Sequence, residues 1–437
     1  MLEPEVEARP WDEQLALDDE SYRAQLSYLL ERSPFYRAKL AGADPDGGLA
    51  ELATLPLTEK DELRASRTRE NPIGEHLCAE RSELVRIYST SGTTGTPSYV
   101  PLTAGDLDNW VTGSARSYAA SGIAAGQRIV STYDAGPFVA GAALASFERI
   151  GLSHIPVGTG HTARLMRAVE LLRPESVVLT PSYAAHLVEW AADRDFDLRG
   201  SSVERVLVAG EPGGGEPGFR EQLEYGWGAR VTEAMGIGDI GVSLWGECEE
   251  QDGMHLGARG FVHPELIEPE SGRALPLEDG AAGELVLTHL RHRAAPLLRF
   301  RTRDHVRVRM SPCPCGRTGP RVRCVGRTDE MLIVRGVNVF PSEIERVVLE
   351  QRGLAPHYQI MLSREGALDR LAVHVEVATE VWKSLGSTTD CDGARQLASR
   401  LRSELAAALS LTADVQLGAP GTIPRSEGKA VRVVDRR

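Results

Sequence analysis

The residues with the clearest chemical pattern lie in one short stretch, residues 88–101, which reads YSTSGTTGTPSYVP. Hydroxyl side chains alternate there with glycines, at Ser91, Gly92, Thr93, Thr94 and Gly95. Glycine allows positive φ and a close approach of the backbone, so N–H groups and hydroxyls can together contact phosphate oxygens. No Gly-Lys-Ser/Thr follows, so this is not a Walker A loop. The pattern predicts a phosphate-binding loop, and a Ser/Thr/Gly linker is the alternative.

Cysteine and histidine form a second pattern with chemical potential. Cys313 and Cys315 are separated by one residue, and Cys248 and His255 lie upstream in ECEEQDGMH. Three thiolates and an imidazole match the ligand set of a closed, tetrahedral zinc site. A Cys-x-Cys pair is a weaker signal than Cys-x-x-Cys, so two buried thiols in a turn stay an alternative. His263 is an alternative candidate for one of the four ligand positions.

The elements that must position these residues alternate as in an α/β protein. From about residue 128, short apolar runs (RIVSTY, LSHIPV, SVVLTP, VERVLVAGE) are separated by helical patterns. This alternation predicts a parallel or mixed sheet covered by helices. Residues 20–40 have apolar side chains at helical spacing and predict an N-terminal amphipathic helix. Strands and turns dominate from about residue 255 to 325.

A smaller α+β unit follows. FPSEIERVVLE has a helical pattern, YQIMLSRE and RLAVHVEVA alternate like strands, and one face of a last helix is formed by Leu397, Leu401, Leu405 and Leu409. The chain is too long for one hydrophobic core. We therefore expect an α/β protein with a large N-terminal domain, residues 1–328, and a small α+β C-terminal domain, residues 329–437.

Charge and composition exclude several classes of protein. The net charge of −13 and the pI near 5.4 argue against non-specific binding to nucleic acid or to an anionic membrane surface, and leave room for a local basic groove that binds phosphate. No apolar run approaches membrane-spanning length, the first residues are acidic rather than signal-like, and six cysteines in a chain of this size do not form a disulfide framework. We expect a cytoplasmic protein without a nucleic-acid or membrane partner.

Almost the whole chain resembles the phenylacetate–CoA ligase family of the acyl-adenylate-forming superfamily. The segments that carry the resemblance follow the family's order: RIYSTSGTTGTP, LTPSYAAHL, AGEP, HPELIEPESG, PLLRFRTRD, CPCGRTG, GRTDEMLIVRGVNVFPSEIE, APHYQI and PGTIPRSEGKA. The resemblance implies an ATP-dependent, AMP-forming enzyme that activates a small, aromatic carboxylic acid and passes it to CoA. It also implies a large multi-sheet adenylating domain, a mobile C-terminal domain, and ATP/AMP, Mg²⁺ and CoA as cofactors.

The resemblance assigns nucleotide contacts. The hydroxyl- and glycine-rich loop would hold the β- and γ-phosphates of ATP, and the adenine pocket would be lined by Gly210, Glu211 and Pro212. Asp304 would accept hydrogen bonds from both ribose hydroxyls, and Arg327 would lie on the ribose and phosphate side. A surface ion pair of little consequence is the alternative for these two residues.

Three further roles come from the same resemblance. Lys429, in PRSEGKA, matches the catalytic lysine, because a cation that bridges the carboxylate and the α-phosphate lowers their repulsion. Asp329 resembles the hinge about which the small domain rotates. That rotation would withdraw Lys429 and bring the loop VRGVN, with Arg335 and Gly336, beside the pantetheine arm of CoA.

Two segments depart from the family pattern. Thr96 replaces the lysine of the phosphate loop and removes a positive charge near the triphosphate. The family's aromatic-Gly-x-Ser/Thr-Glu motif reads Met235-Gly236-Ile237-Gly238-Asp239. Met235 would cover the adenine with its polarizable sulfur, and Asp239, one methylene shorter than glutamate, would hold magnesium more closely or through water. The alternative for Asp239 is that it caps a turn.

The sequence indicates a class of acid substrate and leaves the acyl acceptor open. A stretch of the family's acid pocket matches TYDAGPFVAG, which contains Tyr133, Asp134, Phe138 and Gly141 and suits an aryl or small planar acid. The altered MGIGD motif leaves open another acyl acceptor, such as a carrier-protein thiol, an amine or nitrite. A nucleotide-binding protein without turnover is disfavoured, because Lys429, Asp304 and Arg327 are all present. The family carries similar cysteines and a histidine, which favours structural zinc, and a homodimer is kept open.

Overall fold

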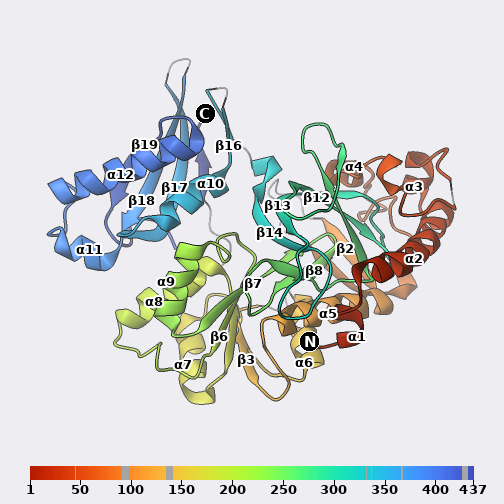
Figure 1. The fold of residues 1–437 in the computed structure, drawn as a ribbon, viewed down its shortest axis with the longest axis horizontal. Coiled ribbons are helices and arrows are strands. Elements are labelled where there is room, and N and C mark those ends of the chain that lie inside the picture. The colour runs from red at the N-terminus through yellow and green to blue at the C-terminus, as the bar shows by residue number, and fades with distance from the viewer. Residues whose placement is uncertain are drawn as a thin grey trace. The chain divides into compact units, whose positions relative to one another are not determined.

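The computed structural model describes residues 1–44, 46–90, 98–133, 141–330, 332–335, 337–365, 368–425 and 432–437. They form two compact units (Figure 1). Unit 1 comprises residues 1–158, 174–177 and 232–324, and unit 2 comprises residues 159–173, 178–231 and 325–437. Unit 2 therefore joins the C-terminal part of the chain to two segments from its middle. The division of the sequence into domains 1–328 and 329–437 stays a prediction.

Unit 1 begins with helices: α1 (Pro4–Glu7), α2 (Trp11–Arg32), α3 (Pro34–Lys39) and α4 (Lys60–Ala65). The predicted N-terminal amphipathic helix over residues 20–40 is confirmed only in part, because α2 begins earlier, at Trp11, and Ser33 separates it from α3. Tyr22, Leu26 and Leu29 on α2 are buried in one cluster with Tyr36 of α3. Burying this apolar face, rather than helix propensity alone, stabilises α2.

The segment predicted to bind phosphate lies in the sequence between two strands that pair antiparallel, β1 (Leu84–Ser89) and β2 (Tyr99–Thr103). Directly after β2, a capping box formed by Thr103 and Asp106 starts α5 (Ala104–Ala120). A parallel pair follows, β3 (Arg128–Ser131) and β4 (Ser153–Pro156), with α6 (Gly141–Ile150) between them in the chain. The predicted alternation of strands and helices is confirmed here.

The strand-rich region predicted from about residue 255 is also confirmed. One antiparallel run contains β7 (Arg230–Ile237), β8 (Gly241–Glu247) and β9 (Met254–Leu256), and β9 pairs with the first residues of β14 (Arg321–Arg327). A second run has the order β11 (Ala274–Leu275), β10 (Val262–Ile267), β12 (Ala282–His289) and β13 (Phe300–Arg309). Most strands of a large mixed sheet thus lie in unit 1, and the fold is mixed α/β as predicted.

Unit 2 contains a four-stranded sheet in its C-terminal part. Its order is β19 (Asp414–Gly418), β18 (Leu368–Val377), β17 (Leu354–Glu365) and β20 (Val433–Asp435), with an antiparallel central pair and parallel outer pairs. The predicted face of four leucines lies on α12 (Asp392–Leu409) and is buried in the same cluster as Ile344 of α10 (Pro341–Glu350). A hairpin of β15 (Leu332–Val334) and β16 (Val337–Val339) precedes α10.

The middle segments of unit 2 supply α7 (Thr162–Leu172), α8 (Pro181–Ala192), β6 (Arg205–Ala209) and α9 (Pro217–Trp227), while β5 (Ser176–Leu179) is shared between the two units. Helix α8 is joined to the C-terminal part by charged groups. Glu189 on α8 lies 3.1 Å from Nε2 of His357 on β17 and 3.3 Å from the guanidinium of Arg425. Among the helices of the described residues, none combines the length and the apolar composition that crossing a membrane requires.

Candidate active site and metal centre

Part of the predicted site lies outside the described residues. This holds for the phosphate-loop residues Ser91, Gly92, Thr93, Thr94 and Gly95, and for Asp134, Phe138, Gly336 and Lys429. The elements beside them are described. Tyr133 is half-buried just after β3, and Gly141 is the first residue of α6.

The turn that carries Asp239 lies between β7 and β8. Gly236 on β7 faces the backbone of β8 so closely that an added Cβ would lie 1.7 Å from the carbonyl oxygen of Val242. Only glycine can occupy this position without a shift of the backbone. The N–H of Ile240 donates to the carbonyl of Ile237 at 2.7 Å and closes the turn. Met235, also on β7, is partly buried and packs against the core.

Asp239 is paired with a lysine that the sequence patterns did not indicate. Nζ of Lys60, the first residue of α4, lies 2.7 Å from Oδ2 of Asp239, and the two side chains are 32% and 13% exposed. This partial burial makes the pair stronger than an ordinary surface ion pair. No motif marks Lys60, since it precedes Asp239 by 179 residues. A metal ion at Asp239 must therefore share the carboxylate with an ammonium group or displace it.

The two residues predicted to contact the ribose belong to different units. In unit 1, Asp304 is 9% exposed on β13. In unit 2, the guanidinium of Arg327 donates two hydrogen bonds to Asp329, at 3.0 and 2.9 Å. Arg327 and the predicted hinge residue are therefore ion-paired in this structure. The predicted joint action of Asp304 and Arg327 on a ribose stays a prediction.

The AGEP segment follows β6 in unit 2. Gly210 has a φ of +92°, a conformation that favours glycine, and a carboxylate oxygen of Glu211 accepts the backbone N–H of Ser182 at 3.3 Å. Pro212 is the next residue. In the β15–β16 turn, Arg335 has a φ of +52° and its guanidinium donates to the carbonyl of Thr412 at 3.0 Å. This contact joins Arg335 to the segment between α12 and β19.

All four predicted metal ligands come together in unit 1. Sγ of Cys248 lies 3.7 Å from Sγ of Cys313, and Sγ of Cys315 lies 3.4 Å from Nε2 of His255. Their four ligand atoms all lie within 4.8 Å of one another. Tetrahedral zinc, with Zn–S near 2.3 Å and Zn–N near 2.0 Å, would separate such atoms by about 3.5–3.8 Å. The donors thus have the chemistry of a closed zinc site, and the Cys248–Cys313 and Cys315–His255 separations are close to its spacing.

The four residues of this group come from the end of β8, from β9 and from one loop. Cys248 directly follows β8, His255 lies on β9 opposite Arg321 of β14, and Cys313 and Cys315 lie in the loop between β13 and β14. The thiol of Cys248 and the ring of His255 lower the pKa of the Cys315 thiol, whereas Cys315 and burial raise the pKa of Cys248. The neighbouring thiols cannot all ionise easily, because their negative charges repel one another. A bound cation would reduce this repulsion.

His263, the alternative candidate ligand, lies on β10 and is not part of the four-residue group that the described residues form. Beside that group, Arg317 pairs with Glu7 of α1 at 2.7 Å, with both side chains buried. Glu7 was not singled out by the sequence, because a glutamate in an acidic N-terminal segment has no distinctive pattern.

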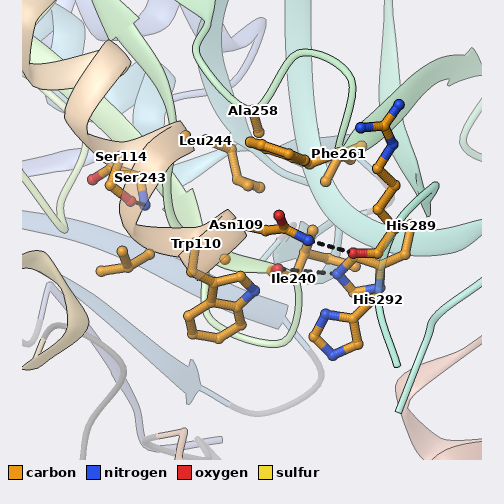
Figure 2. Close-up of a pocket in the computed structure, with 15 residues that line it drawn as sticks. Asn109, Trp110, Ser114, Ile240, Ser243, Leu244, Ala258, Phe261, His289 and His292 are labelled. Atoms are coloured by element: carbon orange, nitrogen blue, oxygen red, sulfur yellow. Dashed lines mark hydrogen bonds between the residues drawn. The ribbon is translucent and has the colours of Figure 1, made fainter. Parts of the chain in front are cut away.

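A small, largely apolar pocket adjoins the Asp239 turn (Figure 2). It is lined from α5 by Asn109, Trp110 and Ser114, from the turn and β8 by Ile240, Ser243 and Leu244, and from other segments by Ala258, Phe261, His289 and His292. Within it, Nε2 of His289 contacts the carbonyl of Ile240. No sequence motif pointed to this pocket, because its residues come from distant segments.

Comparison with known proteins agrees with the fold and with the residues. Residues 34–289 match the model of the AMP-binding enzymes, and residues 336–437 match their C-terminal domain. The phenylacetate-coenzyme A ligase of Thermus thermophilus is 37% identical over 456 residues, which cover 100% of both chains. That of Escherichia coli is 34% identical over 447 residues, covering 100% of this chain and 98% of the relative.

A solved structure of 2-hydroxyisobutyryl-CoA ligase, in the postadenylation state and in complex with 2-HIB-AMP, is similar to this chain with a TM-score of 0.89 and 28% identity. The match covers 99% of this chain and 92% of the other. Full-length identity above 30% to several relatives, with both family models matched in order, leaves no other assignment. The chain belongs to the AMP-binding enzymes and, among them, to the phenylacetate–CoA ligase family.

Proposed function

We propose that this protein is an ATP-dependent, AMP-forming acid–CoA ligase that activates a small aromatic carboxylic acid. In the first half-reaction, a carboxylate oxygen attacks the α-phosphorus of ATP, giving an acyl adenylate and pyrophosphate. In the second, the CoA sulfur attacks the acyl carbon, the thiol proton is lost, and AMP leaves. The observation that carries the proposal is identity over the whole chain to phenylacetate-coenzyme A ligases.

We assign the adenylation step to residues that this chain retains. The loop with Ser91 and Gly92 binds the phosphates through backbone N–H groups and hydroxyls. Asp304 accepts the ribose hydroxyls, with Arg327 beside it, and the segment from Gly210 lines the adenine. Lys429 neutralises the charge that develops between carboxylate and α-phosphate, which is the usual source of catalysis in phosphoryl-type transfers.

Magnesium is proposed at Asp239. When bound, Mg²⁺ neutralises negative charge on the triphosphate. Asp239 offers one carboxylate, and its Oδ2 already accepts a hydrogen bond from Lys60 at 2.7 Å. Lys60 can therefore remain as a second positive charge near the phosphates. This offers a physical compensation for Thr96, which stands where the family's phosphate loop carries lysine.

Structural zinc is proposed at Cys248, His255, Cys313 and Cys315. The support is the separation of the ligand atoms, 3.4 and 3.7 Å for two of the pairs, together with burial of the group. All four ligands come from the chain, so no position is open for substrate or water, and we assign the ion no catalytic step.

The acid pocket and the thiol channel are proposed from the sequence. Tyr133, Asp134, Phe138 and Gly141 would line the acid pocket, and Arg335 with Gly336 would lie beside the pantetheine arm. A different acceptor, such as an amine or a carrier-protein thiol, is the second candidate, because Asp239 alters the motif that usually ends in glutamate. A homodimer and a cytoplasmic location are also proposals, the first tested by light scattering.

A pyrophosphate-release screen tests the function. Purified protein, ATP and Mg²⁺ would be incubated with phenylacetate, benzoate, hydroxybenzoates and, as an aliphatic comparison, 2-hydroxyisobutyrate, each with and without CoA. We expect release with an aromatic acid, slow without CoA and sustained with it, because CoA regenerates the free enzyme. Release that is equal with and without CoA would favour another acceptor, and the absence of release with all acids would contradict the aromatic-acid proposal.

A further inference from the structure

A histidine on a different strand contacts the Asp239 turn. His289, the last residue of β12, places Nε2 at 3.1 Å from the carbonyl oxygen of Ile240, the residue after Asp239 (Figure 2). Ile240 is fully buried, and its own N–H closes the turn onto Ile237. Besides the ion pair of Asp239 with Lys60, the turn therefore has a backbone hydrogen bond from within and a side-chain hydrogen bond from a different strand.

The tautomer of His289 is set by its other nitrogen. Nδ1 lies 3.0 Å from the backbone nitrogen of Leu297, whose N–H donates to it, and the backbone N–H of His289 donates to the carbonyl of Leu297 at 2.9 Å. A ring nitrogen that accepts an amide proton carries none of its own, so Nε2 bears the proton and donates to Ile240. Burial lowers the pKa of His289 to about 3, which keeps the ring neutral.

A second ring supports the first. His292 stacks on His289, with ring centroids 4.3 Å apart and planes 15° from parallel. Nδ1 of His292 lies 3.6 Å from Oδ1 of Asp106. The same oxygen accepts the backbone N–H of Arg293, and Oδ2 of Asp106 accepts that of Ala294. Asp106 caps α5, so the histidine pair rests on a fixed helix start. The ring of His289 has little freedom to turn away from Ile240.

We propose that His289 is a positioning residue for adenylation, which acts through the Ile240 carbonyl to hold Asp239 where it meets Lys60 and the magnesium of ATP. Its effect on turnover rests on the proposed function. Its effect on the turn does not, because that depends only on the hydrogen bond between His289 and Ile240. We assign His289 a positioning role and not a catalytic one, because its hydrogen bonds go to the backbone of Ile240 and Leu297.

Two substitutions separate the two hydrogen bonds of the ring. The side-chain oxygen of asparagine reaches the place of Nδ1, so His289→Asn keeps an acceptor for Leu297 and loses the donor to Ile240. The amide nitrogen of glutamine reaches the place of Nε2, so His289→Gln keeps the donor and loses the acceptor. Each variant removes the ring and one hydrogen bond, and we expect their melting temperatures to fall by similar amounts.

The magnesium dependence of the reaction and amide hydrogen exchange then report on the position of the Asp239 turn rather than on the stability of the whole protein. We expect His289→Asn to raise the Mg²⁺ concentration for half-maximal pyrophosphate release on the order of threefold to tenfold, the effect of one lost hydrogen bond, with His289→Gln within about twofold of wild type. Amide exchange in the peptide 235–244 should be faster in His289→Asn and close to wild type in His289→Gln.

Equal behaviour of the two variants in both measurements would overturn the proposal and leave His289 with a packing role. If the wild-type protein releases no pyrophosphate with any acid, the proposed function is at fault, and the exchange comparison still decides whether His289 holds the turn. Faster exchange in His289→Asn with unchanged magnesium dependence would also overturn it, because the turn would then move without consequence for the metal.

Discussion

The zinc proposal yields a sharp prediction, because Cys313 and Cys78 provide a matched pair of sites. Cys313 is 8% exposed and belongs to the four-residue metal group, whereas Cys78 is 7% exposed in an apolar cluster with Leu26 and Leu29. Replacing either thiol with a hydroxyl is the same chemical change at the same burial. Only Cys313→Ser should release a metal ion.

The expected size follows from linkage. Structural zinc binds with an apparent free energy of about 10–16 kcal/mol, and most of this is folding free energy in sites that exist only in the folded state. If the loss of one of the four ligands weakens zinc binding on the order of a thousandfold, the metal-bound protein loses about 4 kcal/mol of unfolding free energy. Cys78→Ser should cost only about 1–3 kcal/mol for a buried hydroxyl with incomplete hydrogen bonding.

The assay has two parts. Elemental analysis after dialysis against a weak chelator should give close to one zinc per chain for wild type and Cys78→Ser, and far less for Cys313→Ser. Thermal unfolding with and without a strong chelator should show a chelator-dependent loss of stability in the first two proteins and none in the third. Wild-type protein that is free of metal, and whose melting temperature does not respond to chelator, would refute the reasoning and leave these thiols as packing.

Asp239→Asn should raise the magnesium requirement of pyrophosphate release, whereas Asp239→Glu should be tolerated; unchanged magnesium dependence in Asn would end the metal assignment. Lys429→Ala should slow pyrophosphate release on the order of 10²–10³-fold but largely spare thioester formation from supplied acyl-AMP; equal loss of both steps would contradict this role. Asp18→Asn should stabilise the protein by up to about 3 kcal/mol at pH 8 and not at pH 3. Burial raises the pKa of Asp18 in the folded protein from 3.8 to about 6, so the free-energy cost of its buried charge grows as pH rises through that range. Urea unfolding at the two pH values measures the effect, and an equal effect at both would contradict this reasoning.

The metal group could be predicted because its ligands are rare residues in a recognisable pattern. Cys248, His255, Cys313 and Cys315 converge as expected, although more than fifty residues separate the two halves. The helix α2 and the leucine face of α12 could be predicted for a different reason. Each follows a local periodicity that buries one face of a helix.

Other parts of the site have no signature in the sequence. The partner of Asp239 is Lys60, an ordinary lysine at the start of a helix, and the role of His289 depends on a backbone carbonyl, which every residue possesses. Unit 2 also combines segments that are far apart in the sequence. Within it, Glu189 on α8 interacts with His357 and Arg425 from the C-terminal part. Such contacts depend on tertiary folding and not on spacing along the chain.

The most direct test of the central claim is the stoichiometry of one reaction. Wild-type protein would be incubated with ATP, Mg²⁺, CoA and the best acid from the screen, and nucleotides, pyrophosphate and acyl-CoA would be quantified by mass spectrometry and coupled assay. We expect AMP, pyrophosphate and the aryl-acyl thioester of CoA in equal amounts, with no ADP. Pyrophosphate and AMP without any thioester, or formation of ADP in their place, would contradict the assignment of this chain as an AMP-forming acid–CoA ligase.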